Sequence, residues 1–157
     1  MKLWRIATET RKYPADDLSG AAAAVSPGRW NDGTQPVVYC ATTIAIAVLE
    51  TAAHVNDADL PLNRYLVRID VPDEVWALHE QIEAARLPAT WDAIPAGKSS
   101  VQFGSAWLAS NRSPILLLPS VILPEEFIAL INPQHPTAPR ISATAVRPFE
   151  YNRLFRQ

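Results

Sequence analysis

Two short apolar runs constrain the fold of this chain more than any other feature of its sequence. They are PVVYCA, residues 36–41, and PILLLPS, residues 114–120. Brief runs of this kind, bounded by prolines, are typical of strands that are buried on both faces. No apolar run in the chain approaches the roughly 20 residues that a membrane-spanning helix requires. The sequence therefore predicts a buried sheet.

The rest of the pattern predicts further strands and helices around this sheet. Strands are expected at 3–8, 64–71 and 141–149, helices at 16–25, 44–54, 80–86 and 99–111, a helical turn at 124–131, and loops at 88–97 and 132–136. Thr42 or Thr43 can cap the helix that reaches about His54. Short strands interrupted by helices, without a regular βαβ alternation, predict an α+β fold: a single domain with a mixed or antiparallel sheet and short flanking helices.

Length and charge narrow the class of protein. The 157 residues suffice for one domain with a real core. Fourteen Lys and Arg against 16 Asp and Glu leave a net charge of -2, so no broad electrostatic footprint for nucleic acid is present. The single cysteine fits a reducing cytosol, and the first ten residues lack the apolar segment of a secretory signal. We expect a cytoplasmic protein without a membrane segment.

Glu50 is the residue that stands out most. It is the only Asp, Glu, Lys or Arg between Asp32 and Asp57, and its predicted helix is apolar on nearly all sides. A helix of that kind is usually buried, and an unpaired buried carboxylate is costly. Glu50 is therefore a candidate functional carboxylate. The alternatives are a helix rim that reaches solvent or a structural ion pair with an arginine.

Three further residues are candidates for the same site. Arg29 precedes Trp30 in the turn sequence GRWNDG, and its guanidinium offers a planar set of donors suited to phosphate or carboxylate. Tyr39 offers a flat face to a heteroaromatic ring, and Ser120 ends a strand, where side chains commonly reach a crevice. Each has a structural alternative: a turn arginine stacked on Trp30, a tyrosine that fills the core, and a serine that satisfies local backbone.

The sequence gives little support for a zinc site, a cysteine or serine nucleophile, or a glycine-rich phosphate loop. The three histidines show no metal-ligand spacing with one another, and Cys40 has no partner cysteine, which argues against zinc. Cys40 lies in an apolar strand, where thiols are inert. Neither common type of glycine-rich phosphate loop is present, and Ser120 lacks the Gly-x-Ser-x-Gly context of a hydrolase nucleophile.

Taken together and in order, these elements resemble the RES domain, a family named for an arginine, a glutamate and a serine. The resemblance rests on LWRIA near the start, GRWN followed by PVVYCA, the helix that carries Glu50, and LLLPSVILPEEFIALINPQHP. It runs from Leu3 to about Phe155, so a single RES domain is expected over residues 1–157.

The resemblance implies a fold and a function. RES proteins resemble ADP-ribosyltransferases in fold and look like the toxin half of bacterial toxin–antitoxin pairs, usually with an Xre-type antitoxin. Characterised members consume NAD: some split it to nicotinamide and ADP-ribose or a phosphorylated form of it, and at least one modifies a protein. For this chain the resemblance implies cleavage of the nicotinamide–ribose bond of NAD without a metal. It also implies an oligomeric complex whose antitoxin blocks the active site and performs any DNA binding.

The resemblance also assigns the site. The name-giving residues correspond to Arg29, Glu50 and Ser120, with Tyr39 as a further residue of the NAD pocket. Arg29 is expected to bind the pyrophosphate or an adjacent ribose, and Tyr39 to pack against nicotinamide. Glu50 is expected to bind the ribose hydroxyls and stabilise developing positive charge, while Ser120 hydrogen-bonds the nicotinamide end or fixes Glu50. A basic residue or chain terminus of the antitoxin is expected to reach toward Glu50.

Two other functions remain open at this point. One is a protein ADP-ribosyltransferase, in which a protein side chain replaces water or phosphate as acceptor. The other is a non-catalytic module that binds a partner through a degenerate pocket. The chain also departs from the family, which often has a glycine-rich stretch before the arginine, because it reads GAAAAVSPGR there. We expect these alanines to stiffen the loop that approaches the ligand.

Overall fold

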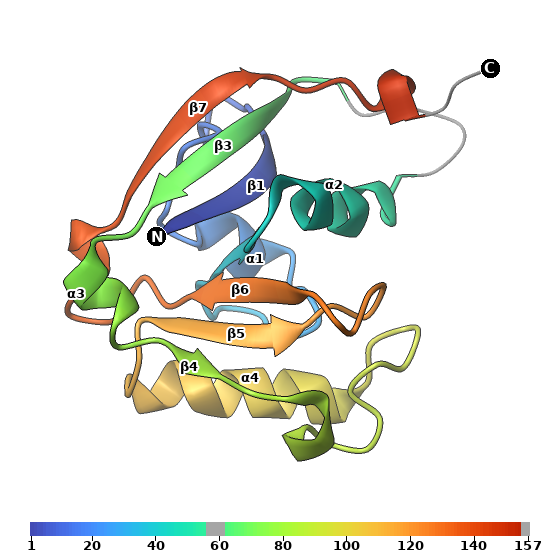
Figure 1. Cartoon of the computed structure of the whole chain (residues 1–157), viewed down its shortest axis with the longest axis vertical. Coiled ribbons are helices and arrows are strands. Elements are labelled where there is room, and N and C mark those ends of the chain that lie inside the picture. The colour runs from blue at the N-terminus through green and yellow to red at the C-terminus, as the bar shows by residue number, and fades with distance from the viewer. Residues whose placement is uncertain (56–61, 155–157) are drawn as a thin grey trace.

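A computed structural model describes residues 1–55 and 62–154. Asp57, which bounds the uncharged stretch around Glu50, and Phe155, at the end of the family resemblance, lie outside the described residues. The described chain forms a seven-stranded sheet in the order β4-β5-β6-β2-β1-β3-β7 (Figure 1). The strands are β1 (Lys2–Thr8), β2 (Val38–Ala41), β3 (Arg64–Asp70), β4 (Glu80–Gln81), β5 (Ile115–Pro119), β6 (Phe127–Ile131) and β7 (Ser142–Pro148). Neighbours are antiparallel except β4 and β5, which confirms the α+β prediction.

Among the described residues, four α-helices flank the sheet: α1 (Ala21–Val25), α2 (Ile44–Ala52), α3 (Asp73–Trp76) and α4 (Lys98–Ser110). The same residues include 3-10 turns at Ala84–Arg86, Ala138–Arg140 and Tyr151–Leu154. The Thr43 side chain caps α2 by accepting a hydrogen bond from the amide of Ile46. Gly20, with a φ of 71°, precedes α1 and limits the predicted helix at 16–25 to its second half. Among the described residues, no helix is long and apolar enough to cross a membrane.

Two predicted helical segments are strands instead. Residues 80–86 contribute β4 and then a 3-10 turn, because Glu80 and Gln81 pair with β5. Residues 124–131 begin like a helix, with a proline and two glutamates, but Phe127–Ile131 is β6, paired on both sides with β2 and β5. Its last four residues are buried. Pairing with distant strands overrides the local helical signal.

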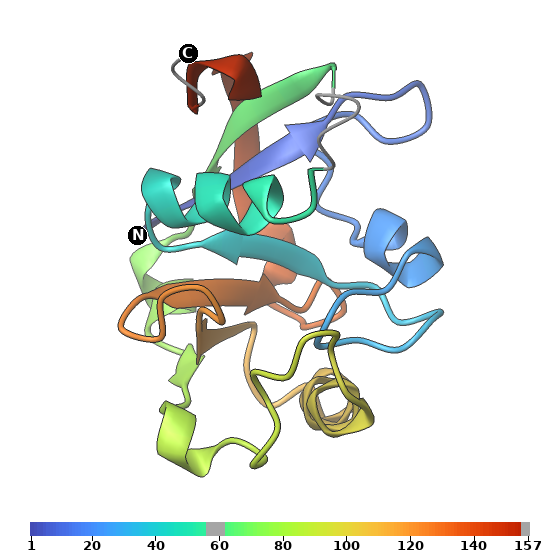
Figure 2. The same ribbon diagram turned by 90° about the vertical axis from the view of Figure 1, so that its right-hand side faces the viewer.

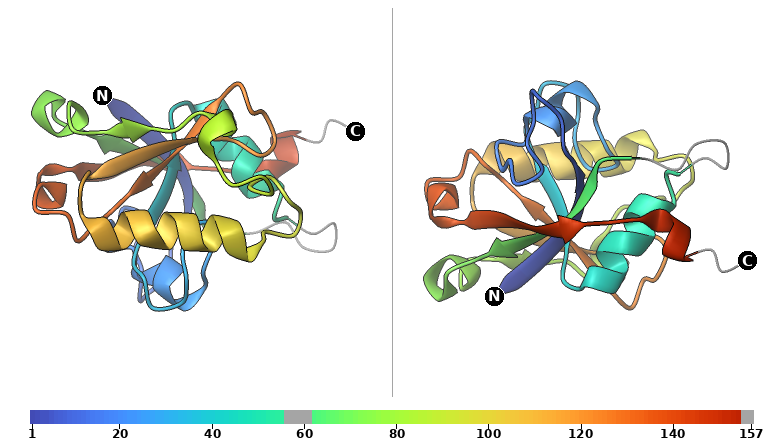
Figure 3. Two further views of the ribbon diagram at one scale, coloured as in Figure 1. Left: turned by 90° about the horizontal axis from the view of Figure 1, so that it is seen from below. Right: turned by 90° about the horizontal axis from the view of Figure 1, so that it is seen from above.

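The core lies on both faces of the sheet. On one face, β2, β5 and β6 pack against α2 and α4, with Trp30 and Trp107 as the largest buried side chains. Viewed from below, α4 runs alongside β5 (Figure 3). The other face is covered by residues around Ala15 and by Val75 of α3. Every residue of β5 is buried, as the apolar run predicts.

The sheet is split between β1 and β2. β1 pairs with β3 along its whole length, but with β2 it shares only the Trp4–Ala41 pair. Beyond that pair the two strands diverge, and β1, β3 and β7 turn away from β2, β6 and β5 (Figure 1). Strands that separate in this way leave a gap that side chains must fill or a ligand can enter.

Candidate active site

A cavity of about 210 Å³ occupies the split in the sheet. Its walls come from β1, β2, the segment around α1, and α2. The lining residues are Trp4, Arg5, Ile6, Asp17, Gly20, Ala22, Ala23, Val37, Val38, Tyr39, Cys40, Ala41, Ala47, Glu50, Thr51 and Ile128. Two of the four predicted site residues, Tyr39 and Glu50, therefore lie in one cavity wall. Ala22 and Ala23 of the alanine-rich stretch before Arg29 also line the cavity.

Glu50 and Ser120 are in direct contact. The Ser120 hydroxyl donates to Oε1 of Glu50 at 2.6 Å, although 70 residues separate them in the sequence. Ser120 is fully buried, and its Oγ also accepts from the amides of Ile122 and Leu123 at 3.1 and 3.2 Å. A hydroxyl has one donor and two acceptor positions, so all of its capacity is used. The geometry therefore makes Ser120 the residue that fixes Glu50.

Arg29 lies next to this pair and is held by backbone. Its Nη1 donates to the carbonyl oxygens of Trp91 and Ala93 at 2.9 and 2.8 Å. Burial lowers the pKa of the guanidinium, and the charge of Glu50 is the largest effect that opposes this shift. The ring of Trp30 packs edge-on against Phe103 in the core instead of lying under Arg29 as a turn stack would require. The backbone contacts anchor the guanidinium, and its charge is near enough to Glu50 for the two charges to interact.

Tyr39 uses its hydroxyl to hold the loop that carries Arg29. The hydroxyl accepts from the amide of Trp30 at 3.0 Å and donates to Oδ1 of Asn31 at 2.8 Å, and burial raises its pKa. A Cβ on Gly28 would lie 2.7 Å from the Tyr39 ring, so only glycine allows this close approach. The Tyr39 hydroxyl therefore holds the loop through these two hydrogen bonds, and Tyr39 also lines the cavity.

Asn31 is a positioning residue that sequence reasoning interpreted only as a turn residue. Its side chain is buried, accepts from the amide of Gly28, and donates to the carbonyl oxygens of Ala23 and Gln35. Together with the bond from Tyr39, these contacts tie the Arg29 loop to α1 and β2. All of these partners lie within eight residues of Asn31, but most of them are backbone atoms, which no residue type marks in a sequence.

Arg5 is a second residue that sequence reasoning missed. It lies in the middle of β1 and lines the cavity, where its Nη1 donates to the carbonyl of Asp17 at 3.0 Å. The available signal was a permanent cation inside the apolar strand LWRIAT, which strand formation alone does not require.

Cys40 also lines the cavity but is held as a neutral thiol. It is buried, its Sγ contacts the carbonyl of Ala129, and burial raises its pKa to about 12. We expect the native protein to resist alkylation by iodoacetamide at about pH 8, where the thiol of an unfolded chain is partly ionised. Mass spectrometry with and without denaturant checks this. Rapid, complete labelling of the native protein would contradict it.

One helix and two loops that carry residues of the candidate site lie on the same side of the molecule. α2, the β5–β6 loop that begins at Ser120, and the loop 88–97 lie on the right in Figure 1 and face the viewer in Figure 2. Within the part of the chain that the structure describes, no group of three His, Cys, Asp or Glu side chains is arranged to hold a metal ion. The candidate site residues described above are Arg5, Arg29, Tyr39, Glu50 and Ser120.

Comparison with known proteins identifies the family of this chain. The sequence pattern of the RES domain matches residues 2–152, and the chain belongs to the RES domain family. Among its relatives is a protein of Sphingobium sp. named Prs ADP-ribosylating toxin, 54% identical over 149 residues, covering 95% of this chain and 92% of the relative. Another is Toxin Res of Yersinia enterocolitica, 33% identical over 135 residues and 86% of each chain.

A solved structure shares the fold. A chain in the crystal structure of the M. tuberculosis MbcT–MbcA toxin–antitoxin complex superposes with a TM-score of 0.66 over 93% of this chain and 84% of its own length. The two sequences are 18% identical.

Proposed function

We propose that this chain is the toxin of a bacterial toxin–antitoxin pair and that it uses NAD as its substrate, cleaving the nicotinamide–ribose bond. The observation that carries the proposal is that Glu50, which lines the same cavity as Tyr39, is held by a hydrogen bond from Ser120. Membership of the RES family and the toxin names of two relatives support it. The proposed setting is the bacterial cytoplasm, where NAD is available.

The chemistry follows from the charges. Nicotinamide carries positive charge until it departs, and the ribose that it leaves becomes oxocarbenium-like. A carboxylate held in one orientation stabilises that charge better than a mobile one, because it needs no reorganisation during the reaction. In this proposal Ser120 fixes Oε1 of Glu50, so that the carboxylate faces the ribose. Tyr39 packs on nicotinamide, and Arg29 binds the pyrophosphate or an adjacent ribose through charge-assisted hydrogen bonds.

The acceptor of the ADP-ribose defines two candidate reactions. In the first, water or phosphate attacks the ribose and cellular NAD is depleted. In the second, a protein side chain attacks and becomes ADP-ribosylated; the name of the relative that is 54% identical favours this second reaction. Both reactions use the same pocket and release nicotinamide.

Labelled NAD separates these reactions. The purified chain is incubated with NAD labelled in its adenylate part, with and without bacterial lysate. Free labelled ADP-ribose or its phosphate identifies hydrolysis or phosphorolysis, and label that migrates with a lysate protein identifies transfer. Label that stays entirely in NAD under both conditions would contradict the proposal and support a non-catalytic binding module.

Replacement of Ser120 by alanine tests how Glu50 is positioned. It removes the donor to Glu50 and the acceptor for two backbone amides, so we expect NAD cleavage to slow by about tenfold or more. The free energy of unfolding should fall by about 1–3 kcal/mol. Single-turnover kinetics and urea denaturation measure the two effects. A Ser120→Ala variant with the parental cleavage rate would show that Ser120 does not position Glu50.

A partner that covers the site is part of the proposal. Apolar side chains are exposed on the elements around it: Leu49 at 39%, Ile94 at 86%, and Ile122 and Leu123 at 40% each. Exposed apolar groups of this kind are typical of protein interaction sites. We propose that the antitoxin, of Xre type by family resemblance, docks on this side and directs a basic residue or chain terminus toward Glu50. The related fold was likewise solved in a toxin–antitoxin complex.

A further inference from the structure

Ser100 is a fully buried serine in the first turn of α4, and its hydroxyl bonds to a neighbouring loop. The hydroxyl donates to the carbonyl oxygen of Trp91 at 3.1 Å. Serine is a weaker helix former than alanine, and a buried hydroxyl costs free energy unless it has a partner. The reason for a serine at this position therefore lies in the loop 88–97 and its contacts.

The carbonyl that Ser100 holds is also an anchor of Arg29. Nη1 of Arg29 donates to the carbonyl oxygen of Trp91 at 2.9 Å and to that of Ala93 at 2.8 Å. A carbonyl oxygen has two lone pairs, so Ser100 and Arg29 together fill the acceptor capacity of Trp91. One peptide group therefore links α4 to the guanidinium.

Arg29 keeps other donors for a ligand. A guanidinium has five N–H donors, and within residues 1–55 and 62–154 both hydrogen bonds of the Arg29 side chain are made by Nη1. The guanidinium is planar and rigid, so the position of the two carbonyl oxygens sets the direction in which Nε and Nη2 point. A shift of the Trp91 carbonyl would therefore shift the donors that Arg29 offers to an anion.

α4 also fixes the backbone beside Arg29. Gly104 lies one turn after Ser100 on the buried face of α4, and a Cβ there would lie 1.9 Å from the carbonyl oxygen of Trp30. Trp30 directly follows Arg29 in the sequence. The helix thus contacts the main chain at one end of Arg29 and, through Ser100, holds the acceptor at the other end. Groups held by a rigid helix are positioned more precisely than groups held by a loop alone.

We propose that Ser100 is a positioning residue for NAD binding, which acts by holding the Trp91 carbonyl where the Arg29 guanidinium bonds to it. This inference rests on the proposed function, in which Arg29 binds the pyrophosphate or an adjacent ribose. Ser100 itself does not line the cavity. Without its hydroxyl the guanidinium is less ordered before NAD arrives, and it loses more conformational freedom on binding.

The test measures nicotinamide release by the purified chain over a range of NAD concentrations. Ser100→Ala should raise the KM for NAD by about three- to tenfold, the effect of one lost hydrogen bond, and should change kcat by less than about twofold. Alanine is a good helix former, so the variant should fold. Partial unfolding would instead lower kcat at an unchanged KM, because it reduces only the concentration of active protein. Ser100→Cys, whose thiol is a weaker donor, should give an intermediate KM.

Ser113→Ala is the matched control. Ser113 is also a buried serine, and it accepts from Nε1 of Trp107 at 2.8 Å and donates to Oε1 of Glu80 at 2.6 Å. Its replacement removes buried hydrogen bonds just beyond the other end of α4. It should therefore lower the stability of the chain and leave the KM for NAD unchanged.

A double-mutant cycle shows whether Ser100 acts through Arg29. Arg29→Met removes the guanidinium and keeps a long side chain, and adding Ser100→Ala to it should change kcat/KM by less than about twofold. An unchanged KM in Ser100→Ala, an equal rise in Ser113→Ala, or an undiminished effect of Ser100→Ala in the Arg29→Met chain would overturn the role of Ser100. Absence of nicotinamide release by the parental chain would instead overturn the proposed function.

Discussion

Replacement of Glu50 by glutamine is expected to slow NAD consumption by on the order of 10²–10³-fold. Glutamine keeps the size of the side chain and can still accept the hydrogen bond from Ser120, which is 2.6 Å long in the parent. What it removes is the negative charge that, in the proposed function, stabilises the ribose as nicotinamide departs. The fold should be unaffected, because Glu50 is only half-buried on α2.

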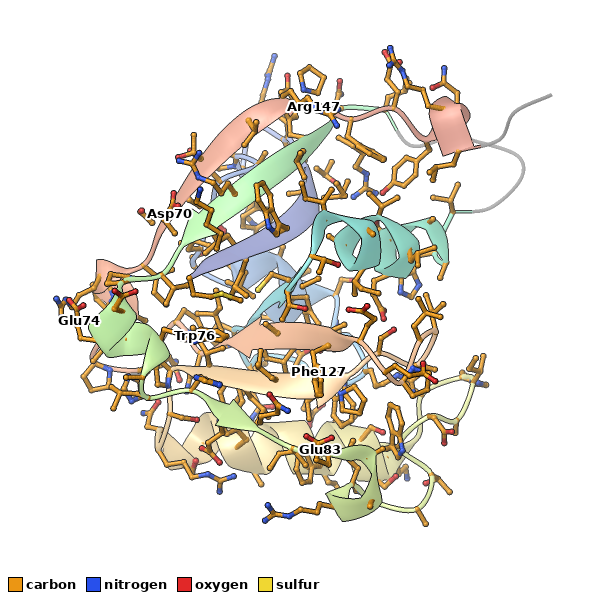
Figure 4. All side chains as sticks on the ribbon, viewed as in Figure 1. Asp70, Glu74, Trp76, Glu83, Phe127 and Arg147 are labelled. Atoms are coloured by element: carbon orange, nitrogen blue, oxygen red, sulfur yellow. The ribbon has the colours of Figure 1, made fainter. Side chains whose placement is uncertain are left out.

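The effect is measured in cells that express either chain without an antitoxin, as the NAD level and growth rate after induction. Glu74→Gln is a suitable control, because Glu74 lies on α3, at the opposite end of the molecule from α2 (Figure 4). Its loss removes only an exposed ion pair with Arg140, which contributes little. NAD loss in cells with Glu50→Gln that matches the parental chain would exclude Glu50 from the chemistry.

Replacement of Trp30 by alanine is expected to lower the free energy of unfolding by about 3–5 kcal/mol. The indole is 1% exposed and fills the core between the Arg29 loop and α4. A Cβ on Gly104 of α4 would lie 1.9 Å from the carbonyl oxygen of Trp30, so loop and helix are in backbone contact there. The loss of the indole removes the packing that sets the position of Arg29.

Chemical denaturation followed by circular dichroism measures this change. Trp76→Ala is the matched control: Trp76 lies on α3, half-buried, and stacks on His79 (Figure 4). Its loss should cost about 1 kcal/mol and leave NAD consumption unchanged. If Trp30→Ala were no more destabilising than Trp76→Ala, the Arg29 loop would not depend on its indole.

Local sequence patterns predicted the elements whose signals are themselves local. β1, β3, β5 and α4 are strongly patterned, and the cap of α2 is a single threonine whose role depends only on the next three residues. β4 and β6 were missed because each forms by pairing with strands far away in the chain. A proline with two glutamates before β6 imitates a helix start, and nothing within that segment reveals its neighbours.

Within the candidate site, too, residues with a local sequence signal could be predicted, and residues that depend on contacts with other segments could not. Glu50 was identified because an isolated carboxylate in an apolar helix needs an explanation, and the structure supplies Ser120 as its partner. The anchors of Arg29 are backbone carbonyls of the loop 88–97, and every residue has a carbonyl, so no residue type marks them. Asn31 and Arg5 were missed for the same reason, because their side chains donate to the backbone carbonyls of Ala23 and Asp17.

The most direct test of the account is the release of nicotinamide from NAD by the purified chain, followed by chromatography in the presence of phosphate and bacterial lysate. Nicotinamide is released whether water, phosphate or a protein accepts the ADP-ribose, so the result does not depend on the acceptor. The account predicts steady release by the parental chain and a rate lower by on the order of 10²–10³-fold with Glu50→Gln. No release by the parental chain, or equal release by both chains, would contradict it.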